Sequence, residues 1–167
     1  VFLDESGCNT DMTRRYAYSL GGSRAVDSAP LSKPKNTTIL SSIRLDGTLR
    51  YTTFSGETTV ERFKRYLETD LLPHLNGNSV LIMDNMKSYH ARAVKNLLDS
   101  SGVRYIYLPP YSPDLNPIEK LWSKVKAFLR KFKARTLDAL PNAIQNAFHS
   151  VTVSDCSGWF RFCGYAL

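Results

Sequence analysis

The stretch Ser79-Val80-Leu81-Ile82-Met83-Asp84 is apolar almost throughout and ends in an acid. Short apolar runs without polar alternation are typical of strands that are buried on both faces of a sheet. In open α/β sheets, ligands gather at the carboxyl ends of such strands. The stretch therefore predicts a central strand of an α/β fold, with Asp84 at the edge where a site would form.

Toward the N-terminus, predicted strands are interrupted by one long irregular segment. Residues 1–6 form a short strand-like run, and residues 15–20 are a predicted second strand because they alternate around Tyr16 and Tyr18. Residues 21–35 contain Gly-Gly, two prolines and three serines, and show little periodicity. This composition predicts a loop or arm.

The remaining elements follow from turn and cap signals. Asp46-Gly47 between two β-rich runs predicts a hairpin. Thr58, followed three residues later by Glu61, has the form of a capping box and predicts a helix start. Asn116 before Pro117 predicts another helix start, with Asn116 as its cap. Besides those already given, the predicted strands are 37–45, 48–54 and 103–108, and the predicted helices are 58–73, 91–100, 117–132 and 137–149, followed by an aromatic tail from residue 154. Hairpin-linked strands pair antiparallel and helix-linked strands pair parallel, so a mixed central sheet with helices on both faces is expected.

Composition limits the class of protein. With 43% hydrophobic and 22% charged residues, the 167-residue chain is expected to be one globular domain, residues 1–167. No apolar run approaches the roughly 18 residues of a membrane span. The net charge of +7 favours a polyanionic partner. Cys8, Cys156 and Cys163 do not suggest a disulfide framework and are expected to be free or buried thiols in a reducing cytosol.

Three acids stand where elements begin or end. Asp4 lies on the first strand, Asp84 closes the central strand, and Glu119 is near the start of a helix. Hard cations such as Mg²⁺ prefer oxygen ligands and keep several waters, so two or three carboxylates suffice to hold them. Each acid has an alternative interpretation: a solvated strand end for Asp4, a turn and helix cap for Asp84, and a capping box with Asn116 for Glu119.

Three motifs contain these acids. They are Phe-Leu-Asp-Glu-Ser-Gly at 2–7, Leu-Ile-Met-Asp-Asn at 81–85, and Leu-Pro-Pro-Tyr-Ser-Pro-Asp-Leu-Asn-Pro-Ile-Glu-Lys-Leu-Trp at 108–122. Together they resemble the DDE transposases of the mariner superfamily. Between Asp84 and Glu119 lie 34 residues, and the third acid is Glu. These two features are similar to the bacterial insertion-sequence branch and its nearest eukaryotic relatives, whereas mariner itself has Asp at the third position.

The resemblance implies an RNase H-like fold with a mixed five-stranded central sheet flanked by helices. It implies that Asp4, Asp84 and Glu119 are catalytic and hold two Mg²⁺ ions, for which Mn²⁺ can substitute. The implied reaction is nicking of transposon ends, followed by attack of the freed 3′-hydroxyl on target DNA at TA. Transposon-end and target double-stranded DNA are the implied partners, with a homodimer in the synaptic complex.

Family members normally carry N-terminal helix-turn-helix domains that recognise the terminal inverted repeats. Such a region is expected in the parent protein and is missing from this sequence. The implied location is the bacterial cytoplasm in association with the nucleoid, or the nucleus if the source is eukaryotic.

Other polar residues are candidates for supporting roles. Asn85 and His90 follow Asp84 and could orient metal ligands or DNA; the alternative for His90 is a surface or capping residue. Trp122 is expected in the core. Cations on the long loop, Arg24, Lys33 and Lys35, are candidates for contact with DNA or a second subunit, or are simply solvated. A basic stretch after Glu119 is either a phosphate-contacting face or a solvated helix face, and its members are Lys120, Lys124, Lys126, Arg130, Lys131, Lys133 and Arg135.

Two other functions remain open at this level. One is a catalytically inactive or domesticated DNA-binding module, against which the intact set of three acids argues. The other is a different RNase H-like nuclease that acts on RNA–DNA hybrids, which the proline-rich run before Glu119 disfavours.

Overall fold

A mixed five-stranded sheet, in the order β3-β2-β1-β4-β5, forms the centre of the computed structural model, which describes residues 1–28, 30 and 34–165. The strands are β1 (Phe2–Cys8), β2 (Thr37–Ile43), β3 (Leu49–Ser55), β4 (Val80–Met83) and β5 (Arg104–Tyr107). The strands β1, β2 and β3 pair antiparallel, whereas β4 is parallel to both β1 and β5. The predicted mixed five-stranded sheet is confirmed, including the hairpin, whose turn has Gly47 at a φ of 85°.

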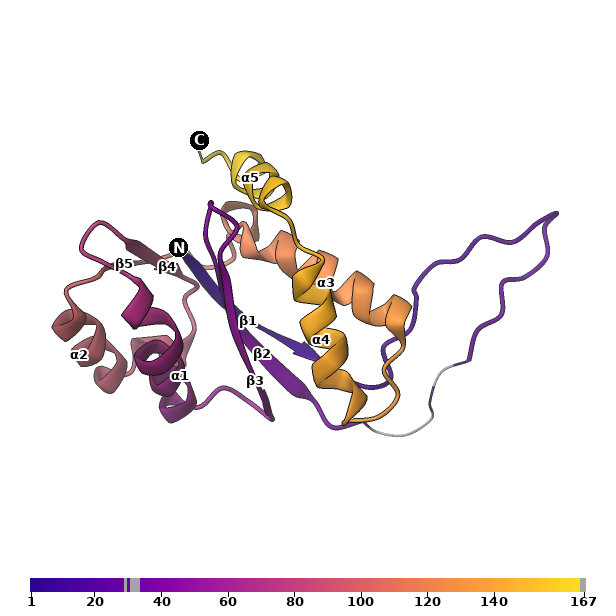
Figure 1. The fold of residues 1–167 in the computed structure, drawn as a ribbon, viewed down its shortest axis with the longest axis horizontal. Helices are drawn as coiled ribbons and strands as arrows, with labels where there is room; N and C mark the ends of the chain where they lie inside the picture. The colour runs from indigo at the N-terminus through magenta and orange to yellow at the C-terminus, as the bar shows by residue number, and fades with distance from the viewer. Residues whose placement is uncertain (29, 31–33, 166–167) are drawn as a thin grey trace.

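Helices cover both faces of this sheet (Figure 1). They are α1 (Val60–Tyr66), α2 (Arg92–Ser101), α3 (Ile118–Phe132), α4 (Ala139–His149) and α5 (Val153–Phe162). A π-helical turn, Leu67–Leu71, continues α1. Short 3-10 turns are Leu72–His74, Lys87–His90 and Pro113–Leu115. The last of these turns interrupts a stretch for which no regular structure is expected.

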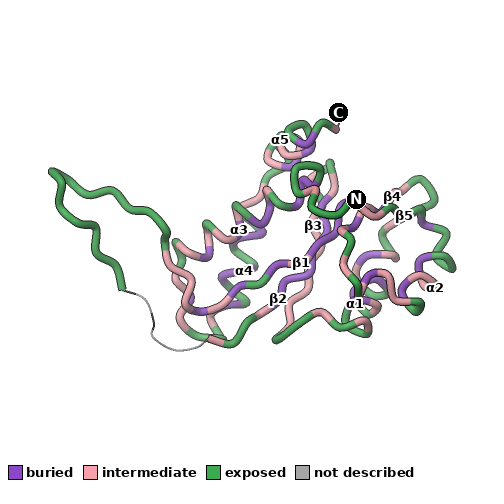
Figure 2. The backbone as a smooth tube through the Cα atoms, turned by 180° about the vertical axis from the view of Figure 1, so that it is seen from behind, coloured by how far each residue is buried: buried purple, intermediate pink, exposed green. Residues whose placement is uncertain are grey.

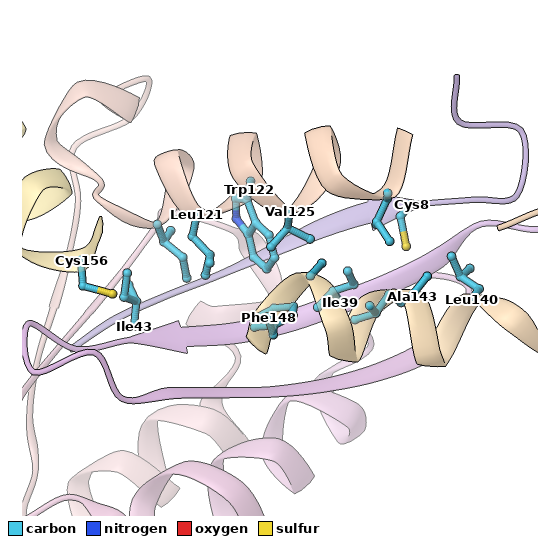
Figure 3. Close-up of a cluster of buried hydrophobic side chains, with 14 of the residues drawn as sticks. Cys8, Ile39, Ile43, Leu121, Trp122, Val125, Leu140, Ala143, Phe148 and Cys156 are labelled. Atoms are coloured by element: carbon cyan, nitrogen blue, oxygen red, sulfur yellow. The ribbon is translucent and has the colours of Figure 1, made fainter. Parts of the chain in front are cut away.

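Two buried clusters lie on opposite sides of the sheet because side chains alternate along each strand. On β1, Phe2 belongs to the cluster under α3 and α4, whereas Leu3 belongs to the cluster under α1 and α2. Figure 3 shows the first cluster, where Trp122 of α3 and Phe148 of α4 meet Ile39 of β2. The alternation anchors β1 from both sides, which fixes the backbone that carries Asp4.

The predicted strand at residues 15–20 is wrong. These residues belong to an arm that projects from the body and is exposed from residue 14 to residue 28 (Figure 2). The side chains of Tyr16 and Tyr18 are 89% and 104% exposed. An alternating pattern forms a strand only where a neighbouring strand completes its hydrogen bonds, and the described chain supplies none here. The predicted loop at 21–35 is confirmed for its described residues, while Lys33 lies outside them.

Two helix starts differ from those expected. Thr59 caps α1 by accepting a hydrogen bond from the Arg62 N–H at 3.3 Å, so the cap lies one residue later than predicted. The aromatic tail contains a helix, α5, that was not expected. Thr152 and Asp155 form a capping box at its start. Among the described residues, no helix is long and apolar enough to cross a membrane.

Candidate active site

Asp4 and Asp84 are brought together by the pairing of β1 with β4. Phe2 pairs with Ile82 and Leu3 pairs with Met83 in parallel register. Asp4 and Asp84 follow these pairs directly, so they lie at the same level of the sheet. The strands β1 and β4 are thus neighbours in the sheet, which places Asp84 beside Asp4.

Glu119 reaches the same place through the loop that follows β5. The N–H of Leu108 donates to the Met83 carbonyl at 2.7 Å, which ties the start of this loop to the end of β4. Glu119 then lies in the first turn of α3, which packs against β1. The three acids line one pocket of about 400 Å³. Its other lining residues are Asn85, Met86, Leu108, Pro109, Pro110, Tyr111, Ser112, Pro113 and Asn116.

The electrostatics of this pocket disfavour the ionised forms of Asp4 and Asp84. Burial, together with the negative charges of Asp84 and Glu119, raises the pKa of Asp4 to about 7. Burial also raises the pKa of Asp84, with Glu5 and Glu119 adding to it. Opposing hydrogen bonds come from Trp122 Nε1, 3.0 Å from Asp4 Oδ2, and from the Met86 N–H, 3.3 Å from Asp84 Oδ1. A buried carboxylate at Asp4, beside a half-buried one at Asp84, is stabilised in its charged form by a cation.

The donor set suits a hard divalent metal ion. It consists of carboxylate oxygens, which Mg²⁺ and Mn²⁺ prefer. Within the described residues, no three His, Cys, Asp or Glu side chains are arranged to hold one ion together. Mg²⁺ usually takes one or two carboxylates and keeps waters, so the pocket does not need three acids on a single ion. The residues therefore fit metal binding through pairs of carboxylates.

Asn85 and His90 form a small support beside Asp84. The two side chains are hydrogen-bonded through Asn85 Oδ1 and His90 Nε2. The ring of His90 lies against that of Tyr107, with centroids 4.1 Å apart. Asn85 lines the pocket, so His90 is placed to orient Asn85 rather than to act in the pocket itself.

The alternative role of Glu119, as half of a capping box with Asn116, does not match the structure. Asn116 makes no side-chain cap to α3, and the prediction that it caps the helix is wrong. Its backbone carbonyl instead accepts from the Glu119 N–H at 3.1 Å. The side chain is buried in the pocket wall, where Oδ1 has no partner among the described atoms. Glu119 is thus free to face the pocket.

Two residues of the site were not expected to contribute. Trp122 is a core residue, as predicted, but its indole also holds Asp4. Its position three residues after Glu119 places it on the same side of the helix, a signal present in the sequence. Tyr111 lines the pocket with a φ of 59° and a fully exposed side chain. Non-glycine residues in this strained conformation gather at functional sites, but no sequence pattern marks it.

The cations of the basic stretch after Glu119 make different contacts. Lys120 lies over the ring of Phe162 at 3.8 Å, and Lys124 pairs with Asp155. Lys131 is exposed on α3. Lys126 and Arg130 line a separate groove. These five cations, like Lys133 and Arg135, lie outside the lining of the acidic pocket.

The fold and this pocket define a class: an RNase H-like domain with one acid on β1, one directly after β4 and one in the first turn of α3. Residues 1–141 match the family described as DDE superfamily endonuclease, and the chain belongs to that family. Similar solved structures include those of Mos1 transposase. The paired-end complex with the left transposon end has a TM-score of 0.79 at 20% identity, covering 96% of this chain and 50% of that one. The Mos1 mariner catalytic domain alone has a TM-score of 0.66 at 16% identity, covering 98% and 75%.

A curated relative is the transposase of the transposable element Tc1 from Caenorhabditis elegans. It is 28% identical over 97 residues, which cover 56% of this chain and 36% of that protein. The matched part of this chain thus spans about a third of the relative's length. A further Mos1 paired-end complex contains Mn, with a TM-score of 0.79 at 21% identity over 96% of this chain and 51% of that one.

Proposed function

We propose that this chain is the catalytic domain of a DDE transposase of the Tc1/mariner type, which cuts transposon ends and joins them to target DNA. The observation that carries the proposal is the convergence of Asp4, Asp84 and Glu119 on one pocket from two parallel strands and a helix start. Membership of the endonuclease family and the likeness to Mos1 complexes with transposon-end DNA support it.

In this proposal, Asp4, Asp84 and Glu119 hold two divalent ions, Mg²⁺ or Mn²⁺. Two such ions can activate an attacking oxygen and stabilise a leaving one in phosphoryl transfer. Asp4 is central among the acids, since its pKa responds to both Asp84 and Glu119. Trp122 holds one oxygen of Asp4 and leaves the other for the pocket. The nucleophile is water for nicking and a DNA 3′-hydroxyl for strand transfer, so one pocket serves both steps.

The finer assignments rest on the sequence. The 34-residue gap and the Glu at the third position favour the bacterial insertion-sequence branch. Insertion at TA is what the resemblance to the mariner superfamily implies. Two transposon ends must be held together for joining, which favours a homodimer on DNA. The proposed location is wherever the element's DNA lies, which is the nucleoid of a bacterial cytoplasm for that branch.

The proposed reaction is tested by cleavage of duplex DNA carrying the element's end, in Mg²⁺. Asp84→Asn and Glu119→Gln keep the size of each side chain and remove its charge. We expect each to lower the cleavage rate by roughly 10³-fold or more, because a carboxylate ligand is lost at the reacting centre. Asp138→Asn, an exposed acid before α4, is the matched control and should cleave normally. Full cleavage by Asp84→Asn would overturn the assignment.

A further inference from the structure

The cations that follow Glu119 fall into two groups by their contacts. Lys124 pairs with Asp155, and Lys133 pairs with Asp27. The guanidinium of Arg135 donates to the carbonyls of Thr10 and Met12 at 3.1 and 3.2 Å. These side chains therefore serve the fold. Lys126 and Arg130 form no ion pair within the described part of the chain.

Lys126 and Arg130 converge with Arg15 on one groove. The groove has a volume of about 490 Å³ and lies between α3 and the segment that leaves β1. Asp11 is the only acid among its described lining residues, so three cations face one carboxylate. Arg15 is exposed, and the other two cations are half-buried.

This concentration of charge is unfavourable for the isolated chain. The pKa of Arg130 is lowered first by burial and then by repulsion from Arg15. Like charges gathered in a partly buried groove raise the free energy of the fold unless an anion offsets them. Lys124 and Lys133 show that this surface supplies acids to its cations elsewhere. The groove therefore has the electrostatic character of an anion site.

The groove continues the helix face that carries Glu119. In an α-helix, residues 7 and 11 positions apart return to within about 20° of the same direction. Lys126 and Arg130 are 7 and 11 residues after Glu119, so they follow it along one side of α3. At about 1.5 Å per residue, they lie roughly 10 and 17 Å along the axis from Glu119. That distance corresponds to roughly three to five nucleotides of one DNA strand at about 3.4 Å each.

We infer that Arg15, Lys126 and Arg130 form a phosphate-binding site for the DNA backbone, a few nucleotides from the bond that is cut. The inference rests on the proposed function, because the DNA strand that the groove binds is the one cut in the acidic pocket. The site reads no bases; its cations fix the position of the strand along α3. Lys120, Lys124 and Lys131 are outside this site, which narrows the basic stretch to two of its members.

The test is the salt dependence of binding to a linear DNA duplex of arbitrary sequence, without divalent metal. Each neutralised phosphate contributes about 0.9 to the slope of log affinity against log salt. The double variant Lys126→Ala/Arg130→Ala should lose roughly two units of slope. The double variant Lys131→Ala/Arg92→Ala removes the same charge from exposed positions on α3 and α2 and should keep the wild-type slope. Circular dichroism checks that each variant is folded.

The outcomes separate this inference from the proposed function. Equal loss of slope in both double variants would mean that surface charge in general binds DNA. It would overturn the assignment of the groove as a phosphate-binding site. A wild-type slope in Lys126→Ala/Arg130→Ala would overturn it as well. Both results leave cleavage and its dependence on Asp84 untouched. If the wild-type chain does not bind duplex DNA at low salt, the groove and the proposed substrate both fail.

Discussion

At the scale of single residues, the charge of Asp4 is needed for the proposed metal site but lowers the stability of the metal-free fold. It is 7% exposed, and its charge is opposed by burial and by two neighbouring acids. Hydrogen bonds from the backbone N–H of Glu5 and from the Trp122 indole favour its ionised form. A bound metal ion would offset this buried negative charge, whereas in the metal-free chain the charge remains unfavourable. The position of Asp4 on a strand could be predicted from the sequence, but its burial depends on Trp122, which lies 118 residues away.

The raised pKa of Asp4 makes stability depend on pH. Its folded pKa is about 7 against an ordinary 3.8, so the folded chain binds the proton more tightly. In metal-free buffer, the free energy of unfolding should therefore fall as pH rises from about 4 through 7. Asp4→Asn removes the buried charge, while its amide oxygen can still accept from Trp122. We expect it to be more stable than wild type by roughly 1–3 kcal/mol at pH 8, and nearly equal at pH 4.

Urea unfolding of both proteins in EDTA at pH 4, 6 and 8 measures this difference. Asp138→Asn, at an exposed position, should follow wild type at every pH. A destabilised Asp4→Asn at pH 8, or a difference that does not change with pH, would show that Asp4 is not under electrostatic strain.

At the scale of elements, side-chain caps begin two of the helices, α1 and α5, and cap signals also misled the prediction of α3. Gly102 ends α2 with a φ of 69°, as its position predicts. Asn116 fits the cap pattern but does not cap, because its side chain is buried in the pocket wall. Thr152 and Asp155 do form a capping box, and the helix they begin was hidden by its aromatic, glycine-containing sequence. Local signals compete with tertiary contacts, and the sequence alone does not show which prevails.

The start of α5 is also where a helix meets the β-hairpin. A Cβ built on Gly47 would lie 2.8 Å from Val153 Cγ2, so only glycine fits the turn at this approach. Thr152 Oγ1 accepts from the Asp155 N–H at 3.1 Å, and Asp155 Oδ2 accepts from the Thr152 N–H at 2.8 Å. Thr152→Ala should destabilise the chain by about 1 kcal/mol, through loss of the cap.

Thermal or urea unfolding at pH 7 measures this loss. Ser154→Ala, an exposed position in the first turn of α5, is the matched control and should change stability by less than about 0.5 kcal/mol. Equal stability of Thr152→Ala and wild type would show that α5 is held by its packing alone.

At the scale of the whole molecule, the order of strands turns separate sequence motifs into a site. The hairpin and the apolar strand at Val80–Met83 could be predicted because their signals are local. That β1 lies between β2 and β4 could not be derived from patterns alone, since register between distant strands leaves no local mark. The family resemblance implied an RNase H-like fold with a mixed five-stranded sheet, and the structure gives the strand order. In the arm, a local pattern gave a wrong prediction. The alternation around Tyr16 suggested a strand, but no neighbouring strand in the described chain pairs with it.

Divalent metal binding by the three acids is the most direct test of the central claim. Titration of the chain with Mn²⁺, followed by electron paramagnetic resonance or calorimetry, needs neither DNA nor cleavage. Wild type should bind Mn²⁺, and Asp4→Asn, Asp84→Asn and Glu119→Gln should each weaken binding by roughly tenfold or more, since each removes a charged oxygen ligand. Asp138→Asn should bind as wild type does. If Asp4→Asn and Asp84→Asn bind Mn²⁺ as tightly as wild type, the pocket is not the metal site and the proposed chemistry is contradicted.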